Sequence, residues 1–245
     1  MLVKMKKTAI IVGASADIGI KIVESLKKRD WNVYGTCNKN KEKLERQLDK
    51  SNIFKINLNS ENSRRELEEM VIGIWRREKR VDAGVYVAGL WNPFFKFIDE
   101  DEDKIKEMWN VNYHGAYWFF RALVPCMIQI KNGSFVSISS TAWTKGSPHA
   151  ETYGATKAAL ANLMISLSEE LANYGIRANI VSPGPTNTKA FRQYYPNDMD
   201  VSEIIKNIPI NKLAEPENIA NCVAYLIEDK YVTRQNIILD GASMF

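Results

Sequence analysis

The chain has 245 residues, a formal net charge of +4 and 25% charged residues, which suits one large α/β domain with a substantial core. Lysines and arginines are interleaved with acids, a pattern that favours a solvated surface over a nucleic-acid-binding face. The three cysteines form no CxxC pair, the two histidines form no metal-ligand pattern, and no apolar run reaches membrane-spanning length. We therefore expect a cytoplasmic protein with no metal, nucleic-acid or membrane partner.

Short β-rich runs alternate with helical periodicity along the whole chain. Strands are predicted at Thr8–Val12, Asn32–Thr36, Asn52–Ile56, Ala83–Val87, Ser134–Ser139, Arg177–Val181 and Asn236–Leu239. Helices are predicted at Ile18–Lys28, Lys41–Leu48, Ser63–Arg77, Asp101–Ile130, Thr152–Tyr174 and Pro216–Glu228, with Gly175 as a left-handed cap and Pro125 as an interruption. The alternation predicts one Rossmann-type domain over residues 1–245, a doubly wound parallel sheet of about seven strands with helices on both faces.

The first strand runs into "GASADIG", residues 13–19. Gly13 permits a tight turn, Gly19 permits close packing of helix on strand, and the free amides at the helix start can face an anion. Asp17 stands where such loops usually carry glycine. We expect it to cap the helix, with its carboxylate turned toward amides two or three positions on and away from any phosphate.

Tyr153 and Lys157 lie four residues apart on a predicted helix, so their side chains share one face. A nearby ammonium favours the phenolate and brings the tyrosine pKa toward the working range. Ser140 ends the fifth predicted strand at the ligand edge, where its hydroxyl can hydrogen-bond a substrate carbonyl. The alternative is an ordinary surface pair of tyrosine and lysine on a helix.

Seven motifs together resemble those of the classical short-chain dehydrogenase/reductase family over nearly the whole chain. They are "GASADIG", "AG" at 88–89, "NVNYHG" at 110–115, "SISS" at 137–140, "YGATK" at 153–157, "PGPTNT" at 183–188 and the terminal "LDGA". The sequence is closest in type to the 3-oxoacyl-acyl-carrier-protein reductases. It departs from the family at "YVAG", where Tyr86 and Val87 replace two asparagines, at "DGA", and at Arg234.

The resemblance implies roles for four catalytic residues. Tyr153 would donate the proton to a carbonyl oxygen, Lys157 would lower the tyrosine pKa and bind the nicotinamide ribose, and Ser140 would orient the carbonyl. Asn112 would hold a water that links Lys157 to solvent; the alternative is a polar residue capping a neighbouring carbonyl. The implied cofactor contacts are Gly13, Ser15, Ile18, Gly19, Asn38, Lys39, Asn57, Leu58, Ala88, Gly89, Tyr153, Lys157, Pro183, Gly184, Thr186 and Thr188.

The second predicted strand favours NADP as the cofactor. An acid at its end usually accepts from the ribose 2′-hydroxyl of NAD, whereas a 2′-phosphate needs cations. No acid stands at Cys37 or Asn38, and Lys39 and Lys41 follow. NAD stays possible, because Lys39 is equally well read as a solvated loop lysine.

The ligand edge gathers aromatic side chains and indicates an apolar or ring-bearing carbonyl or alcohol substrate. They are Trp91, Phe94, Phe95, Trp143, Tyr194 and Tyr195, the last two within a possible lid at about 185–212. Each could instead pack in the core or in a contact between subunits. Lys131 offers charge to an acidic acyl carrier protein, whereas Glu169 and Glu170 count against one.

The 3-oxoacyl-acyl-carrier-protein reductase activity therefore competes with that of a sugar or other alcohol dehydrogenase. An enoyl reductase usually has its tyrosine and lysine further apart than here. A non-catalytic cofactor-sensing regulator is the alternative outside the enzymes. The resemblance also implies a homotetramer or homodimer, although "AYWFFRAL" at 116–123 could be core rather than interface.

Overall fold

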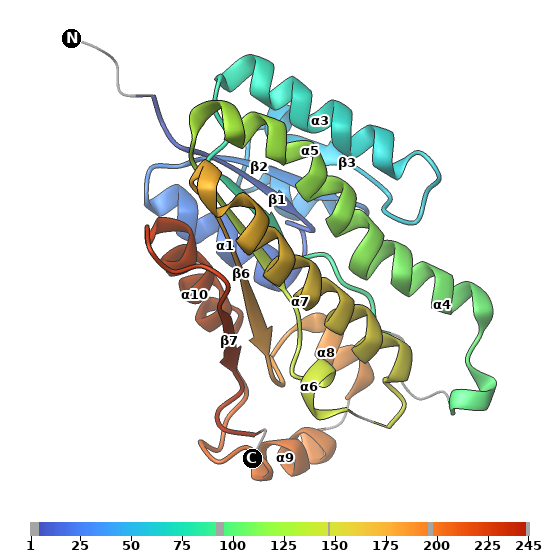
Figure 1. The fold of residues 1–245 in the computed structure, drawn as a ribbon. Helices are drawn as coiled ribbons and strands as arrows, with labels where there is room; N and C mark the ends of the chain where they lie inside the picture. Colours follow the sequence, from blue (N-terminus) through green and yellow to red (C-terminus); the bar gives the residue numbers. More distant parts are fainter. Residues whose placement is uncertain (1–4, 92–95, 147, 196–197, 244–245) are drawn as a thin grey trace.

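The structure, a computed structural model, describes residues 5–91, 96–146, 148–195 and 198–243. Within these residues seven strands form one parallel sheet in the order β3-β2-β1-β4-β5-β6-β7 (Figure 1). They are β1 (Thr8–Val12), β2 (Asn32–Cys37), β3 (Ile53–Lys55), β4 (Ala83–Tyr86), β5 (Gly133–Ile138), β6 (Ile176–Pro183) and β7 (Asn236–Leu239). The direction of winding reverses between β1 and β4, which confirms the predicted doubly wound, Rossmann-type fold.

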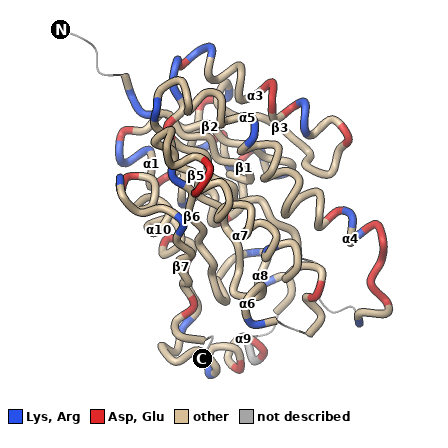
Figure 2. Tube along the Cα trace, viewed as in Figure 1, with Lys and Arg blue, Asp and Glu red and all other residues tan. Residues whose placement is uncertain are grey.

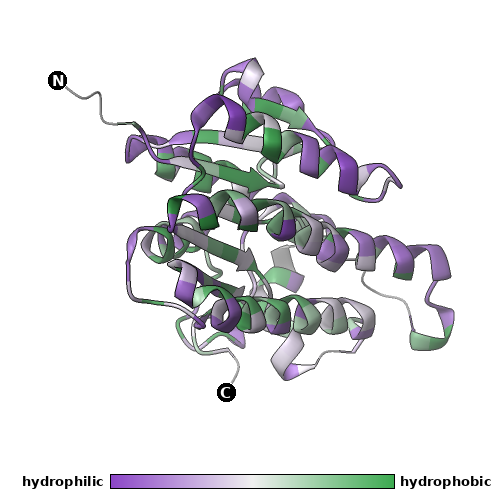
Figure 3. Ribbon diagram, turned by 45° about the horizontal axis from the view of Figure 1, so that its top comes forward, coloured by the Kyte–Doolittle hydropathy of each residue, from purple (hydrophilic) through white to green (hydrophobic). Residues whose placement is uncertain are grey.

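Helices cover both faces of this sheet. On one face lie α3 (Ser63–Glu78), α5 (Gly115–Ile130) and α7 (Glu151–Leu171), whose apolar stripes meet around Phe119 and Phe120. On the other, α1 (Asp17–Lys28) and α10 (Pro216–Glu228) pack against each other. The central strands are largely apolar and the outer turns of the helices are hydrophilic (Figure 3). Strands β1, β4 and β5 are therefore buried on both sides, and their carboxyl ends open on one edge.

The helix predicted at 101–130 is not uniform. It consists of α4 (Glu102–Trp109), a π turn (Asn110–His114) and α5, which follow one another without a break. A π turn closes hydrogen bonds to the fifth residue rather than the fourth, so it inserts one extra residue into the helix. Pro125 lies inside α5, as predicted. Asn112, the residue expected to serve as a relay, is at the centre of the π turn.

The other predicted elements differ at their ends. Helix α2 (Lys41–Glu45) stops before the predicted end at Leu48, and short helix α6 (Ala142–Lys145), which was not predicted, follows β5. After α7 a 3₁₀ turn (Ala172–Tyr174) leads into Gly175, whose φ of 73° confirms the expected left-handed cap.

The segment 185–212, predicted as a lid, contains two short helices, α8 (Lys189–Tyr194) and α9 (Asp198–Lys206). Val201, Ile208 and Leu213 form a small apolar cluster with Phe191 and Tyr195, separate from the two main cores. This cluster gives the segment apolar packing of its own. The lid remains a prediction with this support.

Charges of both signs are spread over the same surfaces (Figure 2). In the basic stretch at 75–80, Arg77 lies 3.2 Å from Glu78 and stacks over the Tyr34 ring, and Arg80 binds Asp82 at 2.8 and 2.5 Å. These contacts give the stretch a structural role. In the described part of the chain, no helix has both the length and the apolar character that a membrane crossing requires.

Candidate active site

The glycine loop between β1 and α1 is a tight cradle. Gly13 has a φ of 83°, and a Cβ placed on it would lie 2.5 Å from the Ala88 backbone nitrogen. A Cβ on Gly19 would lie 2.5 Å from the Gly13 carbonyl oxygen. Both predicted reasons for glycine therefore hold: the turn needs a left-handed residue, and α1 packs directly on the loop. Among the described residues no side chain caps α1, so the amides at its start can serve an anion.

Asp17 does not cap α1, and our prediction for it is wrong. Ala16 holds the cap position, and the Asp17 carboxylate accepts the backbone N–H of Lys189 at 2.6 Å. Its other oxygen lies 3.3 Å from the Lys43 ammonium. The local preference of aspartate for helix caps is outweighed by two donors from α8 and α2. The carboxylate thus connects the glycine loop to the start of the predicted lid.

Tyr153 and Lys157 lie on α7, and Ser140 follows β5. The Ser140 hydroxyl lies beside the Tyr153 phenol and acts to lower its pKa, and the Lys157 Nζ lies 5.7 Å from the centroid of the Tyr153 ring. Lys157 is only 2% exposed and donates to the Ile138 carbonyl at 3.0 Å. A Cβ on Gly89 would lie 3.0 Å from the Lys157 Nζ, so the glycine lets the ammonium pack closely against the loop after β4. The structure therefore brings the three predicted residues together at the sheet edge.

Burial governs the protonation of this group. Desolvation lowers the pKa of Lys157 from 10.5 to about 8. Burial raises the pKa of the Tyr153 phenol, and the hydrogen bond with Ser140 partly opposes that rise. The lowering expected from Lys157 is not seen: burial dominates the Tyr153 pKa, and only Ser140 opposes it. A proton held on Tyr153 is what carbonyl reduction requires of a donor.

Asn112 is fully buried beside this group. Its Oδ1 accepts the Leu90 N–H at 2.7 Å, and its Nδ2 donates to the Leu90 carbonyl and to the Thr156 Oγ1, each at 2.9 Å. The alternative role, capping a carbonyl, is therefore present, but in the loop after β4 rather than in its own helix. Because Thr156 precedes Lys157, Asn112 links that loop to the catalytic turn of α7.

Aromatic side chains cover Tyr153. The Trp91 and Tyr153 ring centroids are 6.0 Å apart, and the Tyr194 hydroxyl of α8 donates to the Trp91 carbonyl at 2.6 Å. The Trp91 ring also contacts Tyr195, with centroids 6.5 Å apart. Trp143 has a structural role instead, because its Nε1 donates to the Ser182 Oγ at 3.3 Å and its ring packs on the core. Phe94 and Phe95 lie outside the described residues.

The other residues assigned to a cofactor lie along the same edge, each in or after the carboxyl end of a strand. Thr188 caps α8 by accepting the Phe191 N–H at 3.1 Å, and Gly184 packs so closely that a Cβ would lie 2.7 Å from the Asp240 Cβ. The residues assigned to the cofactor here are Ser15 and Ile18 after β1, Asn38 and Lys39 after β2, Asn57 and Leu58 after β3, Ala88 and Gly89 after β4, and Pro183, Gly184, Thr186 and Thr188 at or after the end of β6. Their roles as cofactor contacts remain a prediction.

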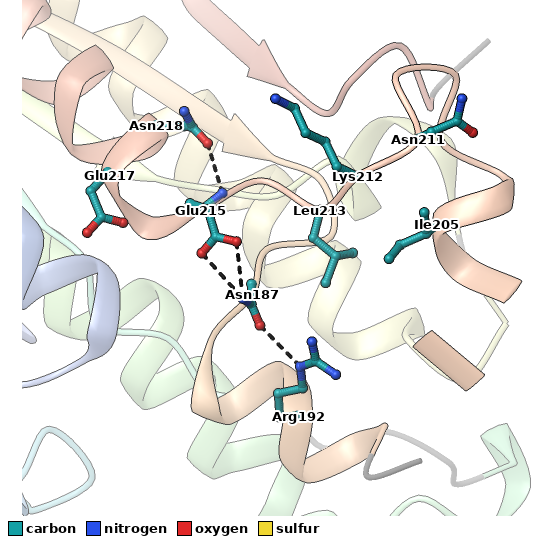
Figure 4. Close-up of a pocket in the computed structure, with 9 residues that line it drawn as sticks. All are labelled: Asn187, Arg192, Ile205, Asn211, Lys212, Leu213, Glu215, Glu217 and Asn218. Carbon is teal, nitrogen blue, oxygen red and sulfur yellow. Dashed lines mark hydrogen bonds between the residues drawn. The ribbon is translucent and has the colours of Figure 1, made fainter. Parts of the chain in front are cut away.

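A separate cleft of about 560 Å³ lies beside the predicted lid (Figure 4). Arg192 donates to the Asn187 Oδ1 at 3.1 Å, and Asn187 donates to the Glu215 carboxylate at 3.1 Å. None of the predicted catalytic side chains lines this cleft. No sequence pattern indicated this cleft, because its walls come from the predicted lid, the loop before α10 and the first turn of α10.

The fold and these motifs define a dinucleotide-binding oxidoreductase of the α/β type. The family model described as "Enoyl-(Acyl carrier protein) reductase" matches residues 13–242. The chain belongs to the short-chain dehydrogenase/reductase family, as its motifs predict.

Similar proteins span the full length of the chain. The "Uncharacterized oxidoreductase YmfI" of Bacillus subtilis is 32% identical over 97% of this chain and 98% of its own length. The 3-oxoacyl-[acyl-carrier-protein] reductase FabG of Rickettsia felis is 30% identical over 97% of both chains. The solved structure "ElxO with NADP Bound" superposes with a TM-score of 0.89 over 98% of this chain and 99% of that one, at 24% identity, a likeness of fold alone.

Proposed function

We propose that this oxidoreductase reduces a carbonyl to a secondary alcohol with NADPH, through Tyr153, Lys157, Ser140 and Asn112. The observation that carries the proposal is the grouping of three side chains at the sheet edge: the Ser140 hydroxyl beside the Tyr153 phenol, and the buried Lys157 ammonium 5.7 Å from the centroid of the Tyr153 ring. A phenol that holds its proton and a hydroxyl beside it are the donors that a carbonyl oxygen needs as it gains negative charge.

The roles of the side chains follow from their placement. Bound NADPH supplies the hydride to the carbonyl carbon. Ser140 orients the carbonyl oxygen, and Tyr153 gives that oxygen its proton. Lys157 then returns a proton toward the phenolate, and the buried Asn112, bonded to Leu90 and Thr156, holds the relay to solvent. Alcohol oxidation runs through the same groups in reverse.

The preference for NADP is supported by the end of β2. Strand β2 ends at Cys37, and no acidic residue stands at this end. Asn38 and Lys39 follow, and both are exposed and can reach a 2′-phosphate. ElxO, a protein of similar fold, has been solved with NADP bound. The Gly13 cradle and the uncapped start of α1 suit the pyrophosphate, and Lys43 offsets the charge of Asp17.

The substrate we propose is a compact carbonyl compound with an apolar or aromatic group. The Trp91 ring contacts Tyr153 and the Tyr194 ring contacts Trp91, so aromatic side chains beside the phenol can receive such a group. Glu169 and Glu170 are exposed on α7, and their negative charge disfavours docking of an acidic carrier protein there, although Arg234 partly neutralises Glu169 at 3.3 Å. A free or short acyl thioester therefore fits better than a carrier-bound one, and a 3-oxoacyl-acyl-carrier-protein substrate is the second candidate because FabG is a relative.

The experiment is an assay of NADPH and NADH oxidation with acyl thioesters, ketones, quinones and aldoses. We expect Tyr153→Phe to lower kcat at least about a thousandfold with little effect on NADPH binding, because only the proton donor is lost. Tyr174→Phe, on an exposed tyrosine after α7, is the matched control and should keep full activity. Equal activity of wild type and Tyr153→Phe, or no turnover of any carbonyl alongside tight NADPH binding, would contradict reduction and favour a cofactor-sensing protein.

A further inference from the structure

Tyr86, at the end of β4, is completely buried and stands where the resembled family has asparagine. Its hydroxyl donates to the Val111 carbonyl at 2.5 Å. Val111 lies in the π turn (Asn110–His114), one residue before Asn112. The replacement therefore adds a long-range contact between the central strand and the turn that carries the predicted relay residue.

The π turn creates the need for this donor. In an α-helix the Gly115 N–H would bond to the Val111 carbonyl, four residues back. Here the Gly115 N–H donates to the Asn110 carbonyl instead. The Val111 carbonyl has lost that α-helical donor, and an unpaired buried carbonyl is unfavourable. The phenol of Tyr86 supplies a replacement.

The fit is specific to the residues on both sides. A Cβ on Gly115 would lie 2.4 Å from the Tyr86 hydroxyl oxygen, so the hydroxyl occupies space that only glycine leaves open. The Tyr86 ring contacts Phe119 and Phe120 of α5, with centroids 6.3 Å away in each case. Burial raises the pKa of Tyr86 far above its ordinary value, so the hydroxyl remains a donor at any working pH.

We propose that Tyr86 is a positioning residue for the proton relay: its hydroxyl holds the π turn at Val111 and thereby fixes the direction of the Asn112 side chain. The relay role of Asn112 rests on the proposed function, whereas the contact of Tyr86 with the π turn does not. Each residue advances a helix by about 100°, so a return of the π turn to α-helix would rotate Asn112 by about that angle. Its amide would then leave Leu90 and Thr156.

The test compares Tyr86→Phe with Tyr34→Phe. Tyr34 is a matched control, since it is 1% exposed and its hydroxyl donates to Glu78 at 2.5 Å, on β2 and away from the π turn. We expect both variants to lose stability, but only Tyr86→Phe to lower kcat by at least about tenfold and to change the solvent isotope effect on kcat. The Michaelis constant for NADPH should stay within about twofold.

Hydrogen exchange at the Leu90 amide reports the position of the Asn112 side chain and does not depend on enzyme turnover. We expect exchange at least about tenfold faster in Tyr86→Phe and unchanged in Tyr34→Phe, because Asn112 protects this amide. Unchanged Leu90 exchange and kcat in Tyr86→Phe overturn the proposal, even if the variant is less stable. If wild type turns over no carbonyl, the proposed function fails, and Leu90 exchange still decides the role of Tyr86.

Gly115→Ala provides a second route if Tyr86→Phe does not fold. The new methyl group must push the Tyr86 hydroxyl away from Val111, so Leu90 exchange should rise in this variant too. Adding Tyr86→Phe to Gly115→Ala removes the atom that clashes, and we expect stability to recover without recovery of kcat. A folded Gly115→Ala protein with wild-type exchange at Leu90 and wild-type kcat would overturn the proposal.

Discussion

Lys157 gives the sharpest test of how burial sets the chemistry of the site. The residue is 2% exposed, and its pKa falls from 10.5 to about 8 through desolvation alone. Because each pKa unit is worth about 1.4 kcal/mol, a protonated Lys157 costs the folded protein about 3 kcal/mol at about pH 7. Replacing it with methionine removes this cost, less about 1 kcal/mol for the hydrogen bond to Ile138.

The sign of the pH dependence follows from the depressed pKa. Between about pH 8 and 10.5 the unfolded chain keeps the Lys157 proton and the folded protein releases it, so wild type gains stability as pH rises. Below about pH 8 both states are protonated and the full cost is present. Relative to Lys157→Met, wild type should therefore gain about 2 kcal/mol between about pH 7 and 9.5.

The assay is urea unfolding of wild type, Lys157→Met and Lys157→Gln at matched protein concentration and at these two pH values. Glutamine retains a donor for the Ile138 carbonyl, so it separates the hydrogen bond from the titration. Both variants should show the same change of their stability gap with pH, although neither should turn over substrate. A gap that stays constant to within about 0.5 kcal/mol would refute the link between burial and the protonation of Lys157.

Three further predictions concern the loop and the lid. Asp17→Asn keeps an acceptor for the Lys189 N–H but removes a charge near the expected pyrophosphate, so titration calorimetry should show NADPH binding about threefold to tenfold tighter; weaker binding would contradict this. Gly19→Ala should lower the unfolding free energy by at least about 2 kcal/mol, because its Cβ meets backbone, whereas Gly73→Ala, with open space, should gain about 1 kcal/mol; similar melting shifts in both would refute the packing. Tyr194→Phe should speed tryptic cleavage at Lys189 several-fold with no change in melting temperature, since it loses the bond to the loop after β4; equal cleavage would argue against that closure.

The catalytic group could be predicted from sequence because its geometry is local. Tyr153 and Lys157 are one helical turn apart and share a face of α7, and Ser140 follows a buried strand, so the helical period and the strand end together point to one group. The glycines of the first loop carry a similar local signal. The role of a residue can be predicted from the sequence when its conformation and packing depend on residues close to it in the chain.

The features that were predicted wrongly, or not at all, depend on residues far away in the sequence. Asp17 has the local preference of a cap residue, but its carboxylate bonds to the amide of Lys189, 172 residues away. The π turn depends on Tyr86, 25 residues before Val111, and no periodicity of the helix reveals it. In "AYWFFRAL" the side chains of Phe119 and Phe120 are wholly in the core, whereas Tyr117 is 37% exposed, so the core accounts for only part of this apolar stretch. The homotetramer or homodimer remains a prediction.

The order of the strands also governs how the nascent protein can fold. Strand β1 leaves the ribosome first, yet one of its two neighbours is β4, and the Thr8 amide needs the buried carboxylate of Asp82. Some seventy residues must therefore be translated before the middle of the sheet can assemble. Strand β7 is the last of the seven along the sequence and extends only an outer edge, so the other six strands can pair before it is added.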